Sequence, residues 1–446
     1  MLCASRSGPA VRLVRSLCSG AVVALVVAAC STSHSATVLP AGTVDPVFGS
    51  GGKLSVDLGS KADRAHAVVV TANGYLVIAG STLDPAQSDN FALARFTSVG
   101  LTDPTFGDNG KVSTDFGGRS DVAAALAQTP DGKLVAAGTS HGTDTGDTIA
   151  VARYTADGRP DPSFGDNGKV STDLGTRADH ANAVVVQPDG RVVVTGSTLD
   201  AAQGDNFVVV RYTADGKPDP SFGAGGKVST DFGGRSDIAA AVALESDGKL
   251  IVAGTSHGTD TGDTIAVARY TADGTLDASF GAGGKVSTDL GTKADHATAV
   301  AVQPDGRIVV AGSTRDAAQG DNFAVVRYTA DGTLDPSFGA AGTVFTDFGG
   351  KSDTATGVAV GSDGRIVVAG TSAGTAAGED IAVARYTGDG KLDLTFGTAG
   401  TVSTDFGSKA DHGNSLAVQP DGRIVVAGST LDPSEGDNVA LVRYQN

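Results

Sequence analysis

Between residues 183 and 232, four short segments have a distinct pattern of apolar and polar side chains. Residues 183–187 and 191–196 are nearly continuous apolar runs joined by a Pro-Asp-Gly turn, which predicts a β-hairpin. Residues 207–212 form a third apolar run, whereas residues 227–232 alternate apolar and polar side chains. Continuous runs are typical of strands buried on both faces, and alternation is typical of a half-exposed strand. The pattern therefore predicts four short strands, the last of them at an exposed edge.

This pattern recurs along the chain with a period of 58 residues. The turn before the second run is found at Asn73-Gly74, Asp131-Gly132, Asp189-Gly190, Asp247-Gly248, Asp305-Gly306, Asp363-Gly364 and Asp421-Gly422. Seven such units fill residues 41–446 completely. One twisted four-stranded sheet buries too little surface alone, so the units must pack together, and radial packing gives a propeller. We predict an all-β fold, a seven-bladed β-propeller of four-stranded blades.

The two ends of the repeat region predict how the propeller closes. Residues 44–58 match residues 334–348, and the chain ends at Asn446, before that segment would recur. We therefore expect an N-terminal strand to complete the last blade. The alternative is an open β-solenoid, but open arrays usually need atypical capping units, and the sequence has none.

Residues 1–29 have the character of a secretory signal peptide. They contain three arginines and no acid, and an apolar run at 21–29 leads to Cys30. The tetrapeptide Val-Ala-Ala-Cys resembles the lipobox of bacterial lipoproteins, and this resemblance implies that Cys30 becomes the lipid-bearing N-terminal residue. Ser31 after it favours the outer membrane, where the cell has one. The alternative is an ordinary signal peptide with a chance cysteine.

The predicted cleavage before Cys30 also determines which cysteines the mature chain keeps and where its N-terminal tether begins. Cys3 and Cys18 lie in the segment to be removed, so no intrachain disulfide is expected. Residues 30–40, rich in Ser, Thr and Ala, are interpreted as a flexible tether. We expect a monomeric protein that is exported across the inner membrane and anchored in the cell envelope by its lipid.

Three sequence motifs carry a resemblance to a known family. Asp-Pro-Ser-Phe-Gly at 219–223, Pro-Asp-Gly-Arg-Ile-Val-Val-Ala-Gly at 304–312 and Ala-Val-Ala-Arg-Tyr-Thr at 266–271 are similar to the delta-60 repeat family of bacterial propellers. The resemblance covers residues 44–446. It implies the propeller fold and brings no active site with it.

Charge narrows the range of partners. The formal net charge is −17 with a pI near 4.7, and loss of residues 1–29 would make it −20. A chain this acidic is repelled by phosphate backbones, so we expect no nucleic-acid partner. The loops entering the first strand and those joining the second and third strands carry −13 of this charge. In a four-stranded blade these loops share one face, which predicts an acidic face for a cation or a basic protein.

Recurring aspartates mark the candidate ligands on that face. One set precedes the third strand: Asp89, Asp147, Asp205, Asp263, Asp321 and Asp437. A second set precedes the first strand: Asp63, Asp121, Asp179, Asp237, Asp295, Asp353 and Asp411. Grouped carboxylates suit Ca²⁺, although Asp also caps turns without any metal. No cofactor is predicted, and Ca²⁺ is the one ion that these residues favour.

No catalytic residue is predicted. Catalysis needs an asymmetric group of residues, and this repeat is nearly symmetric. The histidines that follow Asp179, Asp295 and Asp411 belong to alternate units, so we interpret them as solvated loop residues and not as zinc ligands. The Arg before each strand-ending aromatic is expected to pair with an Asp of the next loop as a structural element.

Three functions remain open at this point. The first is binding or scaffolding through the acidic loop face. The second is a metal-dependent hydrolase or lyase that uses the same face, and the third is a purely structural surface module. Loop sequences alternate between odd and even units, so units 7 and 1 meet as like neighbours. That seam is one natural place for a unique groove.

Overall fold

The computed structural model describes residues 39–60, 62–84, 88–142, 146–175, 178–200, 204–258, 262–316, 320–374, 378–432 and 436–446. These residues belong to one compact unit, Leu39–Asn446. Cys30 and the tether up to residue 38 lie outside the described residues, so the lipid anchor stays a prediction. A search of the described positions finds no helix long and apolar enough to cross a membrane.

The described residues of this unit form 28 β-strands and no helix. In chain order the strands are β1 (Lys53–Val56), β2 (Asp63–Val70), β3 (Leu76–Asp84), β4 (Ser88–Phe96), β5 (Lys111–Thr114), β6 (Ser120–Gln128), β7 (Leu134–His141), β8 (Asp147–Tyr154), β9 (Lys169–Thr172), β10 (Asp179–Val186), β11 (Val192–Asp200), β12 (Gly204–Tyr212), β13 (Lys227–Thr230), β14 (Ser236–Leu244), β15 (Leu250–His257), β16 (Asp263–Tyr270), β17 (Lys285–Thr288), β18 (Asp295–Val302), β19 (Ile308–Asp316), β20 (Gly320–Tyr328), β21 (Thr343–Thr346), β22 (Ser352–Val360), β23 (Ile366–Ala373), β24 (Glu379–Tyr386), β25 (Thr401–Thr404), β26 (Asp411–Val418), β27 (Ile424–Asp432) and β28 (Gly436–Tyr444).

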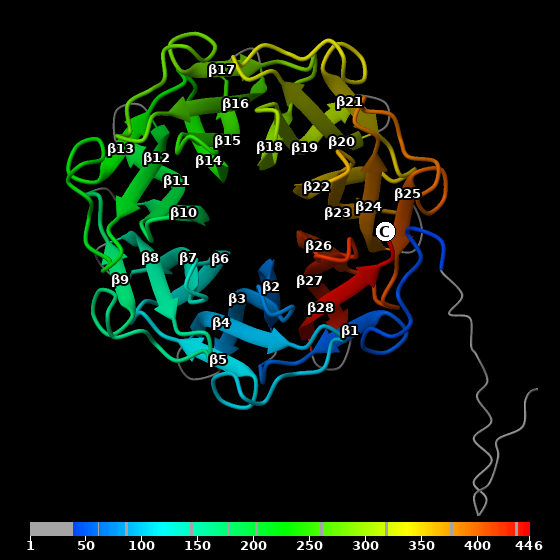
Figure 1. Ribbon diagram of the computed structural model, residues 1–446, viewed down its shortest axis with the longest axis horizontal. Coiled ribbons are helices and arrows are strands. Elements are labelled where there is room, and N and C mark those ends of the chain that lie inside the picture. Colours follow the sequence, from blue (N-terminus) through cyan, green and yellow to red (C-terminus); the bar gives the residue numbers. More distant parts are fainter. Residues whose placement is uncertain are drawn as a thin grey trace, which may run out of the picture. The chain divides into compact units, whose positions relative to one another are not determined.

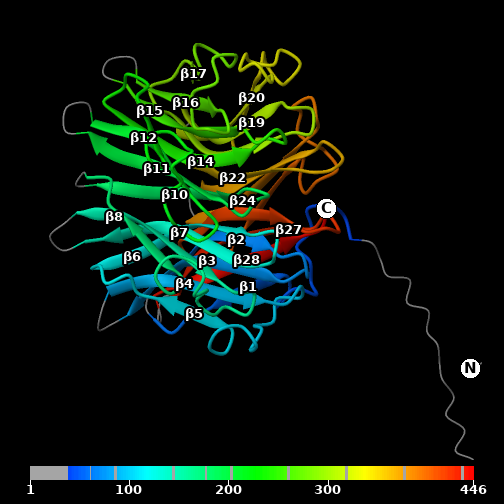
Figure 2. The same ribbon diagram turned by 60° about the vertical axis from the view of Figure 1, so that its left-hand side comes forward.

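These strands build seven antiparallel four-stranded blades, as the sequence predicts. Blade 1 is β2 to β5, and the next five blades follow in chain order up to β22 to β25. Neighbouring blades are in contact all the way round: β4 contacts β6, each following third strand contacts the next first strand, and β28 contacts β2. Figure 1 shows the blades arranged around a centre, and Figure 2 shows the same blades from the side. The all-β propeller fold is confirmed.

The N-terminal strand completes the last blade, which confirms the predicted closure. Blade 7 has the order β26, β27, β28 and β1. Strand β1 pairs antiparallel with β28, with Lys53 opposite Val442 and Val56 opposite Val439. The first and last strands of the unit are therefore hydrogen-bonded neighbours (Figure 1).

Burial follows the predicted pattern in three of the four strands. The second and third strands are almost fully buried, as in β12, and the fourth strand is short and partly exposed, as in β13. The first strand differs from the prediction. Strand β10 begins at Asp179 instead of residue 183, and it is a mixture of buried and half-buried residues. The reason is that the first strands lie nearest the centre of the propeller (Figure 1), where polar side chains can bond to the neighbouring blade, as Asn182 does by donating to the Ala239 carbonyl at 2.8 Å.

One arginine at the end of each third strand joins neighbouring blades. Arg211 Nε lies 2.8 Å from Asp219 Oδ2, and Arg211 Nη1 donates to the Ala272 carbonyl of the next blade. The guanidinium carbon also lies 4.5 Å from the Phe222 ring centroid. The equivalent ion pairs are Arg95 with Asp103, Arg153 with Asp161, Arg269 with Asp277, Arg327 with Asp335, Arg385 with Asp393 and Arg443 with Asp45. The predicted structural pairing is confirmed.

Candidate functional site

We call one face of the propeller the loop face. It consists of the loops that lead into the first strand of each blade and the loops that join the second and third strands. Single parallel bridges hold these two kinds of loop together across blade boundaries, as between Asp147 and Ala178 or between Asp437 and Ala62. Each predicted aspartate before a third strand therefore sits at a boundary with the next blade.

The six predicted aspartates of the third strands do not converge on one point, because each belongs to a different blade. After odd blades, the carboxylate accepts a serine hydroxyl from the next blade, as from Ser120 to Asp89 at 2.9 Å. The same contact joins Ser236 to Asp205 and Ser352 to Asp321. These carboxylates hold the blades together and still keep part of their surface in solvent.

The boundary between blades 7 and 1 differs from these three. Two odd units meet there, and Asp437 pairs with Arg64 at 2.6 Å. An ion pair thus replaces the serine contact at the seam that the sequence marks as unique.

The even blades place histidines beside the same aspartate. His141 Nδ1 lies 3.0 Å from Asp147 Oδ1, and His180 Nε2 of the next blade lies 3.8 Å from Asp147 Oδ2. His257, Asp263 and His296 repeat this group with distances of 3.1 and 3.7 Å. The interpretation of the histidines as separate loop residues rests on Asp-His pairs in alternate units, and it does not predict this convergence, because the two histidines come from adjacent blades.

The predicted aspartates before the first strands are buried. All seven are at most 1% exposed, and each accepts the backbone N–H of the residue five positions earlier, as Asp121 does from Phe116. They are structural acceptors of the loop and add little to its exposed charge. Sequence alone could not separate these carboxylates from exposed ones, since both kinds recur with the same period.

These buried carboxylates differ between odd and even blades. In an odd blade, Asp295 Oδ1 accepts two hydroxyls, from Thr292 and Thr314, each at 2.6 Å. In an even blade, glycine replaces the first hydroxyl residue, and the Oδ1 atoms of Asp121, Asp237 and Asp353 have no hydrogen-bond partner. Burial, with a neighbouring aspartate, raises the pKa of these three carboxyls above its ordinary value.

This difference predicts opposite effects of the same substitution. Asp121→Asn with Asp237→Asn and Asp353→Asn should keep or raise stability at pH 7, because it removes buried charge. The amide oxygen can keep the backbone N–H, and the amide N–H can donate to the serine hydroxyl beside each carboxyl, that of Ser140, Ser256 or Ser372. Asp63→Asn with Asp295→Asn and Asp411→Asn should cost about 2 kcal/mol per site, because the single amide oxygen cannot accept both the backbone N–H and the two hydroxyls. Denaturant unfolding of both triple variants measures the two changes.

The pH dependence provides the control for that comparison. A carboxyl whose pKa is raised on folding stabilises the folded state only when protonated, so its contribution is lost as pH rises through the folded pKa. The difference in unfolding free energy between the wild type and the Asp121, Asp237 and Asp353 variant should therefore shrink as the pH falls towards 3.8. This interpretation would be contradicted if the even-blade variant, with Asp121, Asp237 and Asp353 replaced, lost more unfolding free energy than the odd-blade variant.

A second ring of aspartates on the loop face is exposed, and it is not among the residues predicted from sequence. Each follows a fourth strand and accepts the backbone N–H two residues later, as from Gly117 to Asp115. The members are Asp57, Asp115, Asp173, Asp231, Asp289, Asp347 and Asp405. Their exact recurrence every 58 residues was the available signal.

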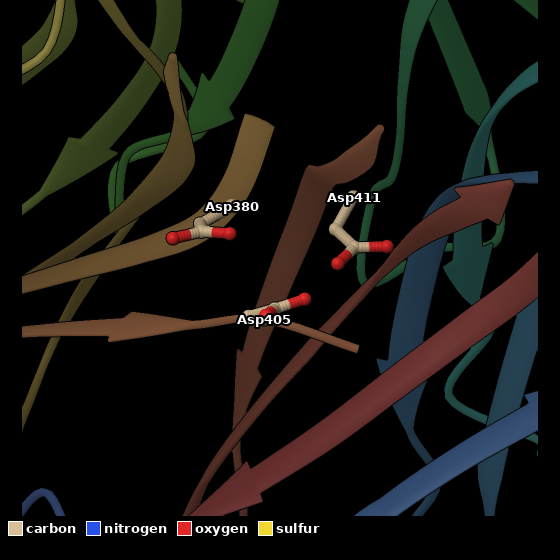
Figure 3. A group of neighbouring side chains, drawn as sticks. All are labelled: Asp380, Asp405 and Asp411. Atoms are coloured by element: carbon tan, nitrogen blue, oxygen red, sulfur yellow. The ribbon is translucent and has the colours of Figure 1, made fainter. Parts of the chain in front are cut away.

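Three carboxylates come together at the boundary of blades 6 and 7. One oxygen each of Asp380, Asp405 and Asp411 lies within 4.8 Å of the others, the one such group of metal-ligating side chains among the described residues (Figure 3). Asp380 is specific to blade 6, since the equivalent positions hold Asn or Thr. Burial first, and then Asp405 and Asp411, raise the pKa of Asp380. A hard cation such as Ca²⁺ matches this set of oxygens.

The opposite face carries grooves between blades, beside the hairpin turns. The groove between blades 4 and 5 has a volume of about 640 Å³ and is lined by Glu245, Arg269 and Gln303. Burial raises the pKa of Glu245. Similar grooves recur at three other boundaries, so they follow from the repeat and are not specific to one blade.

Comparison with known proteins agrees with this architecture. The family model "Domain of unknown function (DUF5122) beta-propeller" matches residues 71–106, 129–164, 187–222, 245–280, 303–338, 361–396 and 419–446, which is more than half of the chain. Each match begins just after a first strand; the first six end at the Phe of the loop after the third strand, and the seventh ends at Asn446. No curated protein matches the sequence.

Solved structures of varied function are similar in fold. A protein of unknown function from Dyadobacter fermentans shares 13% identity over 90% of this chain and 100% of its own, with a TM-score of 0.41. A Lactobacillus plantarum protein shares 14% identity over 83% and 95%, with a TM-score of 0.47. An ulvan lyase of polysaccharide lyase family 25 shares 12% over 88% and 96%, with a TM-score of 0.48. Because these identities and TM-scores are low, we assign no functional residue of these proteins to this chain.

Proposed function

Since this chain belongs to the DUF5122 beta-propeller family, whose description gives no activity, we propose a function from the loop face itself. The protein is a binding or scaffolding module that holds a basic protein surface against its loop face. The observation that carries this proposal is the ring of seven exposed aspartates, one at each blade boundary. Anchoring in the envelope through Cys30 is part of the same proposal.

The arrangement of charges suits an extended partner better than a small one. The exposed aspartates lie one per blade, while the acids of the third strands lie beside them and keep about a quarter of their side-chain surface in solvent, as Asp147 and Asp437 do. Exposed bases such as Arg119 and Lys351 lie in the same loops, but acids outnumber bases there. Charges spread around a ring bind by summed electrostatics, which favours a surface with several lysines or arginines.

The alternative is a metal-dependent hydrolase or lyase on the same face. The group of Asp380, Asp405 and Asp411 is the observation that favours it, because Asp380 breaks the symmetry of the repeat and the three carboxylates match the ligands of Ca²⁺. A purely structural module is the third possibility, in which the acids only keep the protein soluble.

Binding of a lysine-rich peptide to the full-length chain tests the proposal. Six Asp→Asn changes at Asp57, Asp115, Asp173, Asp231, Asp289 and Asp347 should weaken binding by about tenfold to a hundredfold, since each removes one exposed charge. Asparagine keeps the oxygen that accepts the glycine N–H, so the loops should stay folded. Binding of the wild type should also weaken as salt rises, because screening acts within about 8 Å at 0.15 M.

The opposite face supplies a matched control. Six Asp→Asn changes in the exposed hairpin turns, at Asp131, Asp189, Asp247, Asp305, Asp363 and Asp421, remove the same charge and should leave binding nearly unchanged. An equal loss of peptide binding in both variants would mean that net charge alone explains the binding, and this would contradict the proposal. If Ca²⁺ instead raises the melting temperature, and Asp380→Asn removes that rise, the metal-dependent alternative gains support.

A further inference from the structure

We propose that the propeller holds two equivalent binding sites for a divalent transition metal of the Zn²⁺ class. The first consists of His141, Asp147 and His180 at the boundary of blades 2 and 3. The second consists of His257, Asp263 and His296 at the boundary of blades 4 and 5. Two imidazoles and one carboxylate are ligands that Zn²⁺ accepts, with a position left for water or a further ligand.

The fold brings the three side chains together from three strands. His141 ends β7 and lies opposite Asp147, which begins β8, in the register of that hairpin. The parallel bridge between Asp147 and Ala178 then places β10, with His180 as its second residue, beside the same aspartate. The second site repeats this construction in β15, β16 and β18 (Figure 1).

The distances from each histidine nitrogen to the aspartate are close to those between two ligands of one metal ion. Two atoms that are each about 2.1 Å from a tetrahedral Zn²⁺ lie about 3.4 Å from one another. The nitrogen-to-carboxylate distances of 3.0 and 3.8 Å in the first site, and of 3.1 and 3.7 Å in the second, lie on both sides of that value. The paired rings lie 6.1 and 5.9 Å apart between centroids, and the ligand atoms of each group do not all lie within 4.8 Å of one another, so the side chains must rotate to close each site.

The exposure of these side chains leaves room for that rotation and for access by an ion. The histidine side chains of the first site are 41% and 35% exposed, and the Asp147 side chain is 24% exposed. A metal that arrives from solvent can therefore meet both imidazoles without opening the blade boundary.

Only two of the seven boundaries have the complete ligand set. At the position of His141 the other blades have Leu83, Leu199, Arg315, Ala373 and Leu431. At the position of His180 they have Arg64, Val122, Ile238, Thr354 and His412. The boundary of blades 6 and 7 comes closest, because Glu379 lies 3.4 Å from His412, but Ala373 stands where the first histidine would be.

This inference does not depend on the proposed function. The binding of a basic partner uses exposed carboxylates all round the loop face, whereas these sites require imidazole at two boundaries. The protein can therefore bind Zn²⁺ without binding a basic partner, and it can bind a basic partner without binding Zn²⁺.

The test is the number of Zn²⁺ ions bound by the full-length chain after chelator treatment, measured by calorimetry, with Co²⁺ absorption as the reporter of nitrogen ligands. The wild type should bind two equivalent ions. His180→Ala should reduce this to one, and His180→Ala with His296→Ala should reduce it to none at these sites. The cysteines are present in every variant, so any binding by them is a constant background.

Two further variants separate a built site from general attraction of cations. His412→Ala should leave two ions bound, because its boundary lacks the second imidazole. Ala373→His with Glu379→Asp should raise the number to three, because it supplies the missing ligands. Unchanged Zn²⁺ binding in the double histidine variant, with the fold intact by circular dichroism, would overturn the proposal. A wild type that binds no Zn²⁺ would do the same.

Discussion

Deletion of residues 44–58 is expected to lower the free energy of unfolding by at least about 5 kcal/mol and to make the protein aggregate. The deletion removes β1, so the edge of β28 loses its partner. It also removes Asp45, whose Oδ2 lies 2.7 Å from the fully buried Arg443, and Phe48, which is fully buried. Thermal and denaturant unfolding of the full chain with this deletion measure the loss.

Reattachment of the strand at the other terminus provides the control. The N–H of Gly42 donates to the Gln445 carbonyl at 2.8 Å, as Gly216 does to Thr213 within one chain segment. A chain in which residues 41–58 directly follow Asn446 should therefore recover nearly all of the stability. A deletion variant that unfolds cooperatively at the wild-type temperature would contradict closure by β1.

The repeat made most of the fold predictable from sequence. Apolar runs of about six residues and Gly turns every 58 residues determine four strands per unit, and the phase of residues 44–58 determines the closure. The start of the first strand was not predictable in the same way. Residues such as His180 and Asn182 give it a mixed pattern, because its polar side chains contact neighbouring blades, as Asn182 does by donating to the Ala239 carbonyl.

The candidate site was predictable only in part, since its chemistry depends on contacts between blades. Asp121 and Asp295 occupy equivalent positions, but the hydroxyl partners of Asp295 come from two other segments, and one is glycine in the even blade. His141 and His180 meet only because β8 and β10 lie side by side. A comparison of equivalent positions within the repeat does not show which different positions come into contact.

Replacement of one inter-blade arginine is expected to have the second largest effect. Arg211→Met should cost about 3 kcal/mol, because the variant removes a guanidinium that is 3% exposed and leaves the buried Asp219 with only Arg191 beside it. The hydrogen bond to the Ala272 carbonyl of the next blade is lost as well. Arg211→Lys should recover little of this, because one ammonium cannot reproduce the planar contact with Phe222 and the separate donors.

A matched surface arginine and the pH dependence distinguish this mechanism from a general loss of charge. Arg159 is 81% exposed beside Asp157, so Arg159→Met should change stability by less than about 1 kcal/mol. Burial alone would raise the pKa of Asp219, but hydrogen bonds from Ser221 and the charges of Arg211 and Arg191 lower it overall. A carboxyl with a lowered pKa stabilises the folded state above its unfolded pKa, and that contribution is lost as the pH falls. The wild type should therefore lose more stability than Arg211→Met between about pH 5 and pH 3. Parallel pH profiles for the two proteins would show that the ion pair does not stabilise the boundary between blades 3 and 4.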